Sequence, residues 1–360
     1  MNQKLLAIGA VFFSVVTPLK ATAASFVHEI YSFGDSLVDP GNLFQLTLER
    51  RVELGLPAPV PQTPPYAQRL SNGPVWVEFL ASDLGLTPAL STSLGLTPPL
   101  IPSLGSEFPN DGIHFGFGGA STGTLNTNLP SPTGTLLQIA RFQNFLESTP
   151  NFQPNNENAL YILLAGNNDY AGSRITPRVE DISGPINNTE FALSSLIDLG
   201  AQNILVSNLP LLGLTPRFRE SPEADDINEL IMLHNMALSE TLDKWRKKLP
   251  DINLVSFDFN AVFENAVSNP ADFGLTNVTT PCLTNFSFPF DADFNICSNP
   301  DEFLFWDDFH PTTSSHRFVA DAALETLREF ESVPESTPAL SLLALGVLGV
   351  GSILKRKIQG

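Results

Sequence analysis

The stretch Phe33–Asn42 reads FGDSLVDPGN and is the feature that most constrains this chain. A β-prone run, His28–Phe33, leads into Gly34-Asp35-Ser36, and turn-forming residues follow. A serine just past the end of a strand, at a sharp turn that glycine permits, can present its hydroxyl above the edge of a sheet. Because a hydroxyl is a poor nucleophile at neutral pH, a nucleophilic Ser36 would need a base within hydrogen-bond reach.

The chain offers five histidines as that base: His28, His114, His234, His310 and His316. His310 stands out because it lies in the segment FWDDFHPT, three residues after Asp307. On a helical turn or tight loop this spacing brings both side chains to one face. The aspartate can then hold the tautomer of the imidazole while the other ring nitrogen takes the serine proton. We therefore predict a catalytic set of Ser36, His310 and Asp307, with Asp308 as the competing orienting acid.

Four blocks in this order resemble the GDSL lipase/esterase family, also called SGNH hydrolases: FGDSLVDPGN, GIHFGFGGASTG (112–123), GNND (166–169) and an Asp-x-x-His at 307–310. The similarity runs from about Phe26 to Glu329, nearly the whole chain between its two ends. The spacing in the last block favours Asp307 over Asp308. The resemblance implies hydrolysis of carboxylic esters through an acyl-enzyme on Ser36, without a cofactor or a metal.

The same resemblance implies three donors for the developing oxyanion. They are the backbone N–H of Ser36, the backbone N–H of Gly119 and the side chain of Asn168. Gly118 is the alternative to the glycine donor, and Asn167 is the alternative to the asparagine.

Five strand-like runs are spread along the chain: His28–Phe33, Ile113–Phe117, Ala159–Leu164, Asn203–Ser207 and Ile252–Phe257. Helical patterns fall between or after them: Val75–Leu84, Thr135–Leu146, Glu190–Asp198, Ile227–Lys248 with Asp225 or Asp226 as its cap, and Ser314–Glu329. Strands that alternate with helices pair in parallel between two helix layers. The SGNH resemblance accordingly implies an α/β fold, a flavodoxin-like three-layer α/β/α sandwich with a mainly parallel five-stranded sheet. Sites in such folds lie at the carboxyl ends of the strands.

Both ends of the chain have the composition of targeting segments. Residues 1–23 combine Lys4, the apolar run Leu5–Val16 and small residues before Ala23, as in a secretory signal peptide. Residues 333–360 contain Pro334-Glu335, a 16-residue apolar run and a basic end, and resemble a PEP-CTERM sorting tail. An ordinary tail anchor or a docked apolar helix is the alternative. We thus expect one hydrolase domain, 26–331, exported to the periplasm, cell surface or medium, with export and sorting machinery as partners and possible membrane anchoring.

Cys282 and Cys297 are the two cysteines of the chain, fifteen positions apart in one loop. In an oxidising compartment we expect them to form a disulfide, and without clustered histidines they do not suggest zinc. They fall within 259–304, a long irregular stretch with several phenylalanines that could line an acyl pocket or pack locally. A second long apolar loop, 86–105, is either a lid or a loose connection.

The expected substrate is therefore an ester, and apolar loops favour acyl lipids. The alternatives are an O-acetyl esterase for polysaccharide and a surface-binding protein without catalysis, since His114 stands where relatives usually have asparagine. A formal net charge of −19 argues against nucleic acid as a partner. Asp39 and Asn42 are expected to fix the turn after Ser36 through side-chain to backbone hydrogen bonds.

Overall fold

The computed structural model describes residues 27–96, 109–171, 182–287, 290 and 293–332. The predicted signal peptide, the predicted sorting tail and residues 97–105 of the predicted lid loop lie outside the described residues. Within the described part, no helix is both long enough and apolar enough to span a bilayer.

The centre of the fold is a six-stranded sheet in the order β2-β3-β1-β4-β5-β6, in which every neighbouring pair is parallel. The strands are β1 (Glu29–Gly34), β2 (Ala89–Leu90), β3 (Gly112–His114), β4 (Ala159–Leu164), β5 (Asn203–Ser207) and β6 (Asn253–Phe257). The predicted count of five strands was therefore wrong by one. The extra strand, β2, has two residues paired with β3 at the edge, which is too short to show an alternating pattern in the sequence.

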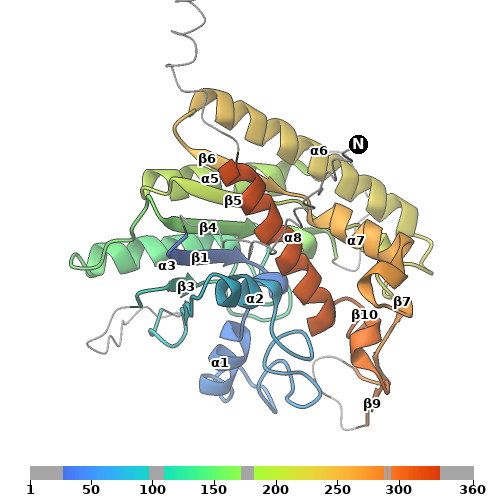
Figure 1. The fold of residues 1–360 in the computed structure, drawn as a ribbon. Coiled ribbons are helices and arrows are strands. Elements are labelled where there is room, and N and C mark those ends of the chain that lie inside the picture. The colour runs from blue at the N-terminus through green and yellow to red at the C-terminus, as the bar shows by residue number, and fades with distance from the viewer. Residues whose placement is uncertain (1–26, 97–108, 172–181, 288–289, 291–292, 333–360) are drawn as a thin grey trace, which may run out of the picture.

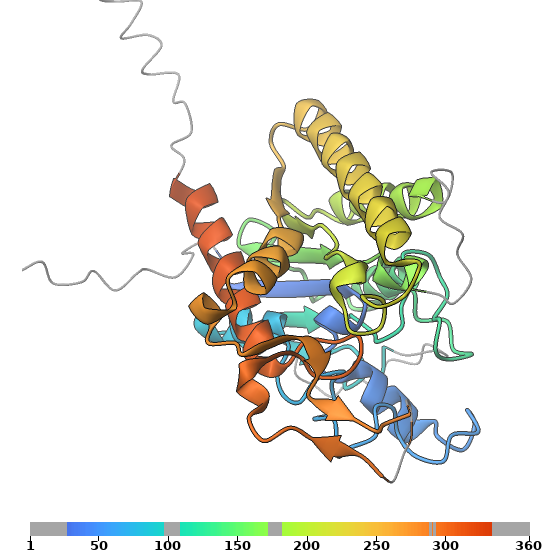
Figure 2. The same ribbon diagram turned by 90° about the vertical axis from the view of Figure 1, so that its right-hand side faces the viewer.

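Helices cover both faces of this sheet (Figure 1 and Figure 2). The eight helices are α1 (Asn42–Glu49), α2 (Trp76–Asp83), α3 (Thr135–Ser148), α4 (Asn167–Tyr170), α5 (Ser183–Asp198), α6 (Ala224–Lys248), α7 (Phe259–Ser268) and α8 (Thr313–Ser332) among the described residues. On one face, Ile162 of β4 belongs to a buried cluster with Trp76 and Val319, from α2 and α8. On the other face, Tyr161 clusters with Phe142 and Leu238, from α3 and α6. Successive residues of β4 thus enter opposite cores, which confirms the three-layer α/β/α sandwich.

Two helix predictions were wrong in detail. Helix α7 occupies the start of the stretch predicted to be irregular, and Asp258 caps it by accepting a hydrogen bond from Ala261 N at 2.9 Å. Helix α6 begins at Ala224, so Asp225 and Asp226 lie in its first turn rather than at its cap. In that position their charges still complement the amino end of the helix dipole.

An insertion between α7 and α8 forms a small subdomain beside the carboxyl ends of the central strands. It contains β7 (Asn277–Pro281) paired with β10 (Phe303–Phe305), and β8 (Leu283–Thr284) paired with β9 (Asn295–Ile296). A disulfide joins Cys282 and Cys297, whose sulfur atoms are 1.98 Å apart. Phe290 and Phe294 pack against the apolar cluster formed by this insertion and α1. Much of the phenylalanine-rich stretch therefore serves local packing.

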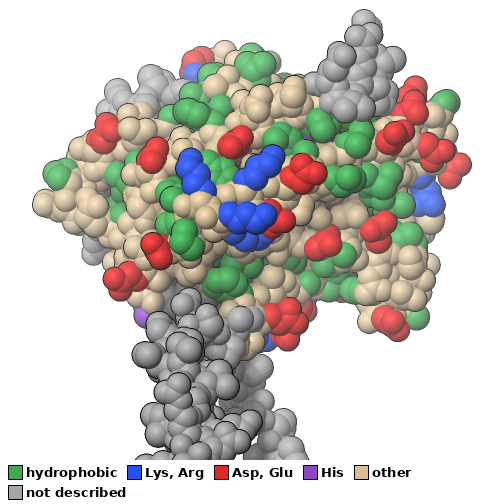
Figure 3. Space-filling view, turned by 90° about the horizontal axis from the view of Figure 1, so that it is seen from above, with side chains coloured by type: hydrophobic (Ala, Val, Ile, Leu, Met, Phe, Trp, Pro, Cys, Tyr) green, Lys and Arg blue, Asp and Glu red, His purple; other side chains and the backbone are tan. Residues whose placement is uncertain are grey.

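Basic side chains gather near the middle of the face seen in Figure 3. Helix α6 ends with Arg246, Lys247 and Lys248 in its last turn. Arg246 pairs with Asp243 one turn earlier, at 2.9 Å. Cations at the carboxyl end of a helix are stabilised by its dipole, so this group needs no ligand to explain it.

The turn that follows β1 predicts a large effect for Gly34→Ala. Gly34 has a φ of +144°, and a Cβ added there would lie 1.7 Å from the carbonyl oxygen of Leu164. We expect the free energy of unfolding to fall by more than about 2 kcal/mol, because strained backbone and a backbone clash add together.

Urea denaturation followed by circular dichroism measures this change, with Gly55→Ala as the matched control. Gly55 also has a positive φ, +67°, but nothing lies within 4 Å of its added Cβ. It should lose only about 1 kcal/mol from backbone strain. Equal losses in the two variants would show that the clash at Gly34 does not matter.

Candidate active site

Ser36 lies at the carboxyl end of the central strand β1, in the first turn of the 3-10 helix Ser36–Val38. Asp35 precedes it as the cap, and the Asp35 carboxylate accepts a hydrogen bond from Leu37 N at 3.0 Å. The Gly34 backbone is held by Gln138, whose side chain both accepts from Gly34 N and donates to Gly34 O, each at 2.8 Å. Ser36 is only 4% exposed. The chain therefore holds this serine rigidly at the edge where ligand sites of parallel sheets form.

The structure brings the three predicted residues together although 274 positions separate Ser36 from His310. His310 Nε2 is 3.1 Å from Ser36 Oγ. On the other side of the ring, His310 Nδ1 is 2.8 Å from Asp307 Oδ2. This is the hydrogen-bonded series in which a base can take the proton of a serine while an acid holds the ring.

The charges of this series shift two pKa values in opposite directions. Burial alone would lower the pKa of His310, but the neighbouring carboxylate of Asp307, its hydrogen bond and the charges of Asp308 and Asp35 raise it above the ordinary value. Burial alone would raise the pKa of Asp307, but the charge of His310 and hydrogen bonds from His310 and Tyr66 lower it. The pair thus favours an ionised Asp307 and a basic imidazole.

Tyr66 is a member of this group that the sequence did not reveal. Its hydroxyl donates to Asp307 Oδ2 at 2.7 Å, across 241 positions of the chain. Its ring packs edge-on against Trp306 and Phe286, with centroids 6.4 and 5.5 Å away. Tyr66 belongs to none of the recognised sequence blocks, and no spacing connects it to Asp307, so only the fold shows the contact.

The proposed oxyanion donors lie around the same point. Gly119 and Asn168 line one cavity with His310, and Gly119 has a φ of +80°. Neither the N–H of Ser36 nor that of Gly119 has an acceptor among the residues that the structure describes. The Asn168 amide is 3.0 Å from Ala120 O, to which its Nδ2 donates.

Of the two alternatives, Gly118 is already engaged, because Gly118 N donates to Asp39 Oδ2 at 2.7 Å. Each asparagine amide has one acceptor, Asp35 Oδ2 for Asn167 and Ala120 O for Asn168, both at 3.0 Å. The two asparagines differ in position: Asn167 is buried, whereas Asn168 lines the cavity. The geometry therefore favours Gly119 over Gly118 and Asn168 over Asn167.

Asp39 and Asn42 fix the turn after Ser36, as predicted. The Asp39 carboxylate accepts hydrogen bonds from four backbone N–H groups, at 2.6 to 3.1 Å: those of Gly41, Asn42, Leu43 and Gly118. Burial nevertheless raises the pKa of Asp39 to about 6. The Asn42 amide donates to His114 O at 2.9 Å, which ties the serine turn to the glycine block.

The remaining histidines of the described chain do not contact Ser36. His114, at the position unusual for the family, is buried with Nδ1 2.7 Å from Ser32 Oγ. Burial, aided by the charge of Arg69, lowers the pKa of His114 to about 3, so this ring is neutral. His234 pairs with Tyr170 at 2.7 Å. The unusual histidine therefore has a packing role and leaves the serine site intact.

A cavity of about 850 Å³ opens beside this group. Asp307 and His310 line it, and so do the following side chains: Tyr66, Thr127, Asn128, Arg217, Leu283, Thr284, Asn285, Phe286, Ser287, Asp308 and Phe309. No cluster of His, Cys, Asp and Glu able to hold a metal ion occurs among the residues described. The lining mixes amides and hydroxyls with aromatic rings, and several of its members come from the insertion.

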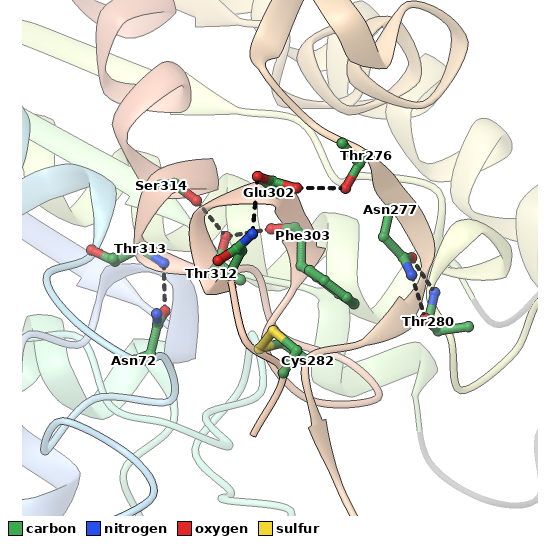
Figure 4. The surroundings of a disulfide bond; sticks show 12 residues. Asn72, Thr276, Asn277, Thr280, Cys282, Glu302, Phe303, Thr312, Thr313 and Ser314 are labelled. Carbon is green, nitrogen blue, oxygen red and sulfur yellow. Dashed lines mark hydrogen bonds between the residues drawn. A yellow bond between two sulfur atoms is a disulfide. The ribbon is translucent and has the colours of Figure 1, made fainter. Parts of the chain in front are cut away.

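The disulfide stands close to the backbone that carries the histidine. Cys282 N donates to Phe305 O at 3.0 Å, directly before Trp306 and Asp307. Figure 4 shows its surroundings, where Thr312 Oγ1 donates to Phe303 O at 2.7 Å and Thr313 N donates to Asn72 Oδ1 at 2.8 Å. These contacts fix the segment between β10 and α8 on both sides of His310.

A three-layer α/β domain with a Ser–His–Asp series at the carboxyl ends of parallel strands has the architecture of a serine hydrolase. The chain belongs to the GDSL-like Lipase/Acylhydrolase family, whose family model matches residues 30–323. It is accordingly a hydrolase that acts on ester bonds.

Several curated proteins are similar to this chain. Thermolabile hemolysin of Vibrio parahaemolyticus is 28% identical, over 83% of this chain and 64% of the hemolysin. A GDSL esterase/lipase of Arabidopsis thaliana is 26% identical over 83% of this chain and 86% of the plant protein. Acetylajmalan esterase 2 of Rauvolfia serpentina is 25% identical over 86% of this chain and 93% of the Rauvolfia protein. Among solved structures, a GDSL-like lipase from Parabacteroides merdae matches with a TM-score of 0.41 and 15% identity, over 84% of this chain and 96% of that one.

The contact between Tyr66 and Asp307 predicts that Tyr66→Phe lowers kcat roughly tenfold, because a buried carboxylate loses one charge-assisted hydrogen bond. KM should change little. Without the Tyr66 donor, Asp307 pairs more strongly with protonated His310, so the pKa of His310 rises. The acid limb of the pH profile of kcat/KM should therefore move to higher pH, since the base must be unprotonated to act.

Steady-state rates on a short p-nitrophenyl ester between pH 4 and 9 measure both effects. Tyr31→Phe is the matched control, because it removes another buried hydroxyl that donates to a carboxylate, Glu29 Oε2, at 2.8 Å. A Tyr66→Phe enzyme with the kcat and the acid limb of the parent protein would contradict a positioning role.

Proposed function

We propose that the protein hydrolyses carboxylic esters through an acyl-enzyme on Ser36. Ser36 Oγ attacks the ester carbonyl carbon while His310 Nε2 takes the hydroxyl proton. The tetrahedral intermediate collapses as His310 returns that proton to the leaving oxygen, and the alcohol departs. His310 then takes a proton from water, the resulting hydroxide attacks the acyl carbon, and the acid leaves as Ser36 regains its proton.

The observation that carries this proposal is the continuous contact from Ser36 Oγ through His310 to Asp307, at 3.1 and 2.8 Å, beside an open cavity. The oxyanion would be bound by Ser36 N–H, Gly119 N–H and the Asn168 amide. Such donors each contribute about 10²–10³ to the rate of acyl transfer. A catalytically silent surface protein would not need to keep this geometry.

For the substrate, the cavity favours a short acyl group on a polar alcohol. Amide and hydroxyl side chains such as Asn128, Asn285 and Thr284 line it beside Phe286. A long acyl chain laid there would leave these groups without hydrogen bonds, at a cost in binding. This observation favours the O-acetyl esterase hypothesis over a lipase for long chains, and the related Rauvolfia protein is named for an acetyl ester.

The disulfide between Cys282 and Cys297 supports a location outside the reducing cytosol. The proposal of an exported enzyme therefore rests on that bond together with the leader-like residues 1–23. The proposals of a sorting tail and of membrane anchoring rest on the sequence of residues 333–360 alone.

Replacing the nucleophile should abolish turnover. Ser36→Ala is expected to lower kcat on p-nitrophenyl acetate by about 10⁴-fold or more, because the acyl-enzyme cannot form. Ser195→Ala, which removes a hydroxyl on the exposed side of α5, is the matched control and should keep full activity. Turnover by a folded Ser36→Ala protein, checked by circular dichroism, would refute the assignment, as would the absence of labelling of the parent protein by a fluorophosphonate.

The acyl-length profile tests the substrate. With p-nitrophenyl esters from acetyl to palmitoyl, kcat/KM should be highest for acetyl to butyryl and fall by about tenfold or more at octanoyl, because the polar lining offers long chains little apolar contact. A maximum at long chains would instead support the lipase hypothesis.

A further inference from the structure

Arg217 gives the cavity a feature that ester hydrolysis itself does not require. It is the one lysine or arginine among the described residues that line the cavity. Its side chain is 49% exposed, in a chain with 38 acidic and 19 basic residues. A cation that faces a substrate cavity in so acidic a protein calls for a chemical explanation.

The guanidinium of Arg217 is held in place without using its hydrogen-bond donors. Its carbon lies 5.7 Å from the ring centroid of Phe309 and 5.9 Å from that of Phe218, within the range of cation–π attraction. The Arg217 backbone N–H donates to Asp308 O at 2.8 Å. No guanidinium N–H has an acceptor among the described residues, and the nearest carboxylate oxygen, Asp308 Oδ2, is 3.9 Å from Nε, too far for a hydrogen bond.

Arg217 is connected to His310 through the ring of Phe309. The Phe309 ring meets the His310 ring edge-on, with centroids 5.3 Å apart. In the proposed reaction His310 protonates the leaving oxygen, so the alcohol part of the ester lies next to His310 and within the same cavity. The unused N–H donors of the Arg217 guanidinium suit a carboxylate or phosphate group of a substrate, because arginine pairs with such groups in bidentate geometry.

We propose that Arg217 forms a subsite for an anionic group, a carboxylate or a phosphate, carried on the alcohol part of the ester. The inference rests on the proposed function, since it assigns the substrate class of that same site. Asp308, at 3.9 Å and 62% exposed in its side chain, opposes anions there and sets how strongly they are preferred.

Two matched substrate pairs test the subsite. One compares 1-acetylglycerol with 1-acetylglycerol 3-phosphate, and the other compares an acetylated methyl glucoside with the corresponding methyl glucuronide. The parent enzyme should show a higher kcat/KM for the anionic member of at least one pair, which identifies phosphate or carboxylate as the recognised group. This preference should weaken at high salt, because a half-exposed charge is screened.

Substitutions then assign the preference to one side chain. Arg217→Gln should lower the ratio of kcat/KM values, anionic over neutral, by about tenfold, as expected for loss of a charge-assisted contact. Arg217→Lys should retain part of the ratio, because charge remains without the fork. Asp308→Asn should raise it. Arg219→Gln is the matched control: it removes the same charge two positions away, outside the cavity lining, and should leave the ratio unchanged.

Equal use of both members of both pairs by the parent enzyme, or equal effects of Arg217→Gln and Arg219→Gln, would overturn the subsite. Calorimetry of the Ser36→Ala protein with glycerol 3-phosphate and with methyl glucuronide measures binding to the subsite in the absence of turnover. Binding of either compound that is lost with Arg217→Gln supports it, and no such binding overturns it. Failure of the hydrolysis mechanism would appear separately, as turnover that persists in Ser36→Ala.

Discussion

The buried carboxylate of Asp307 is the group on which the rest of the site depends. A carboxylate loses much of its solvation when it is buried, and it stays ionised only if hydrogen bonds replace the lost water. Asp307 receives them from the backbone N–H groups of Phe309 and His310 at 2.8 and 2.6 Å, from the His310 ring and from Tyr66. The same bonds that keep the acid ionised thus fix the histidine backbone and ring. The orientation of His310 and the ionisation of Asp307 therefore depend on the same hydrogen bonds.

These contacts require the serine segment and the histidine segment, which are far apart in the sequence, to meet. The position of β1 in the sheet determines where they meet. β1 runs through the middle of the sheet between β3 and β4 and ends at Gly34, where the absent side chain lets the Leu164 carbonyl approach. The histidine segment reaches this edge from β10, and its turn is closed by Trp306 N donating to His310 O at 2.7 Å. Ser71 Oγ donates to Pro311 O at 2.9 Å from a third segment. Rigid anchoring on both sides keeps a 3.1 Å contact between residues that the sequence places far apart.

The sequence predicted best where one local cause dominates. The runs Ala159–Leu164 and Asn203–Ser207 are buried along their whole length, so their apolar composition alone marks them as central strands. Asp307 and His310 could be paired because they share one turn. β2 was missed because its edge pairing depends on β3 rather than on its own pattern. Tyr66 was missed because its contact crosses the chain, and α7 because it begins inside a stretch whose later part is irregular.

The proposed catalytic groups and much of the cavity wall come from different parts of the chain. The groups proposed to break the ester bond lie at the ends of the sheet strands or in the turn before α8, where backbone hydrogen bonds hold them. Much of the remaining cavity wall, Leu283 to Ser287, belongs to the insertion that the disulfide closes. Phe286 links the two, because it lines the cavity and also packs against Tyr66, which holds Asp307. A change in the insertion can therefore alter the cavity while leaving the sheet unchanged, but a change at Phe286 would reach the acid as well.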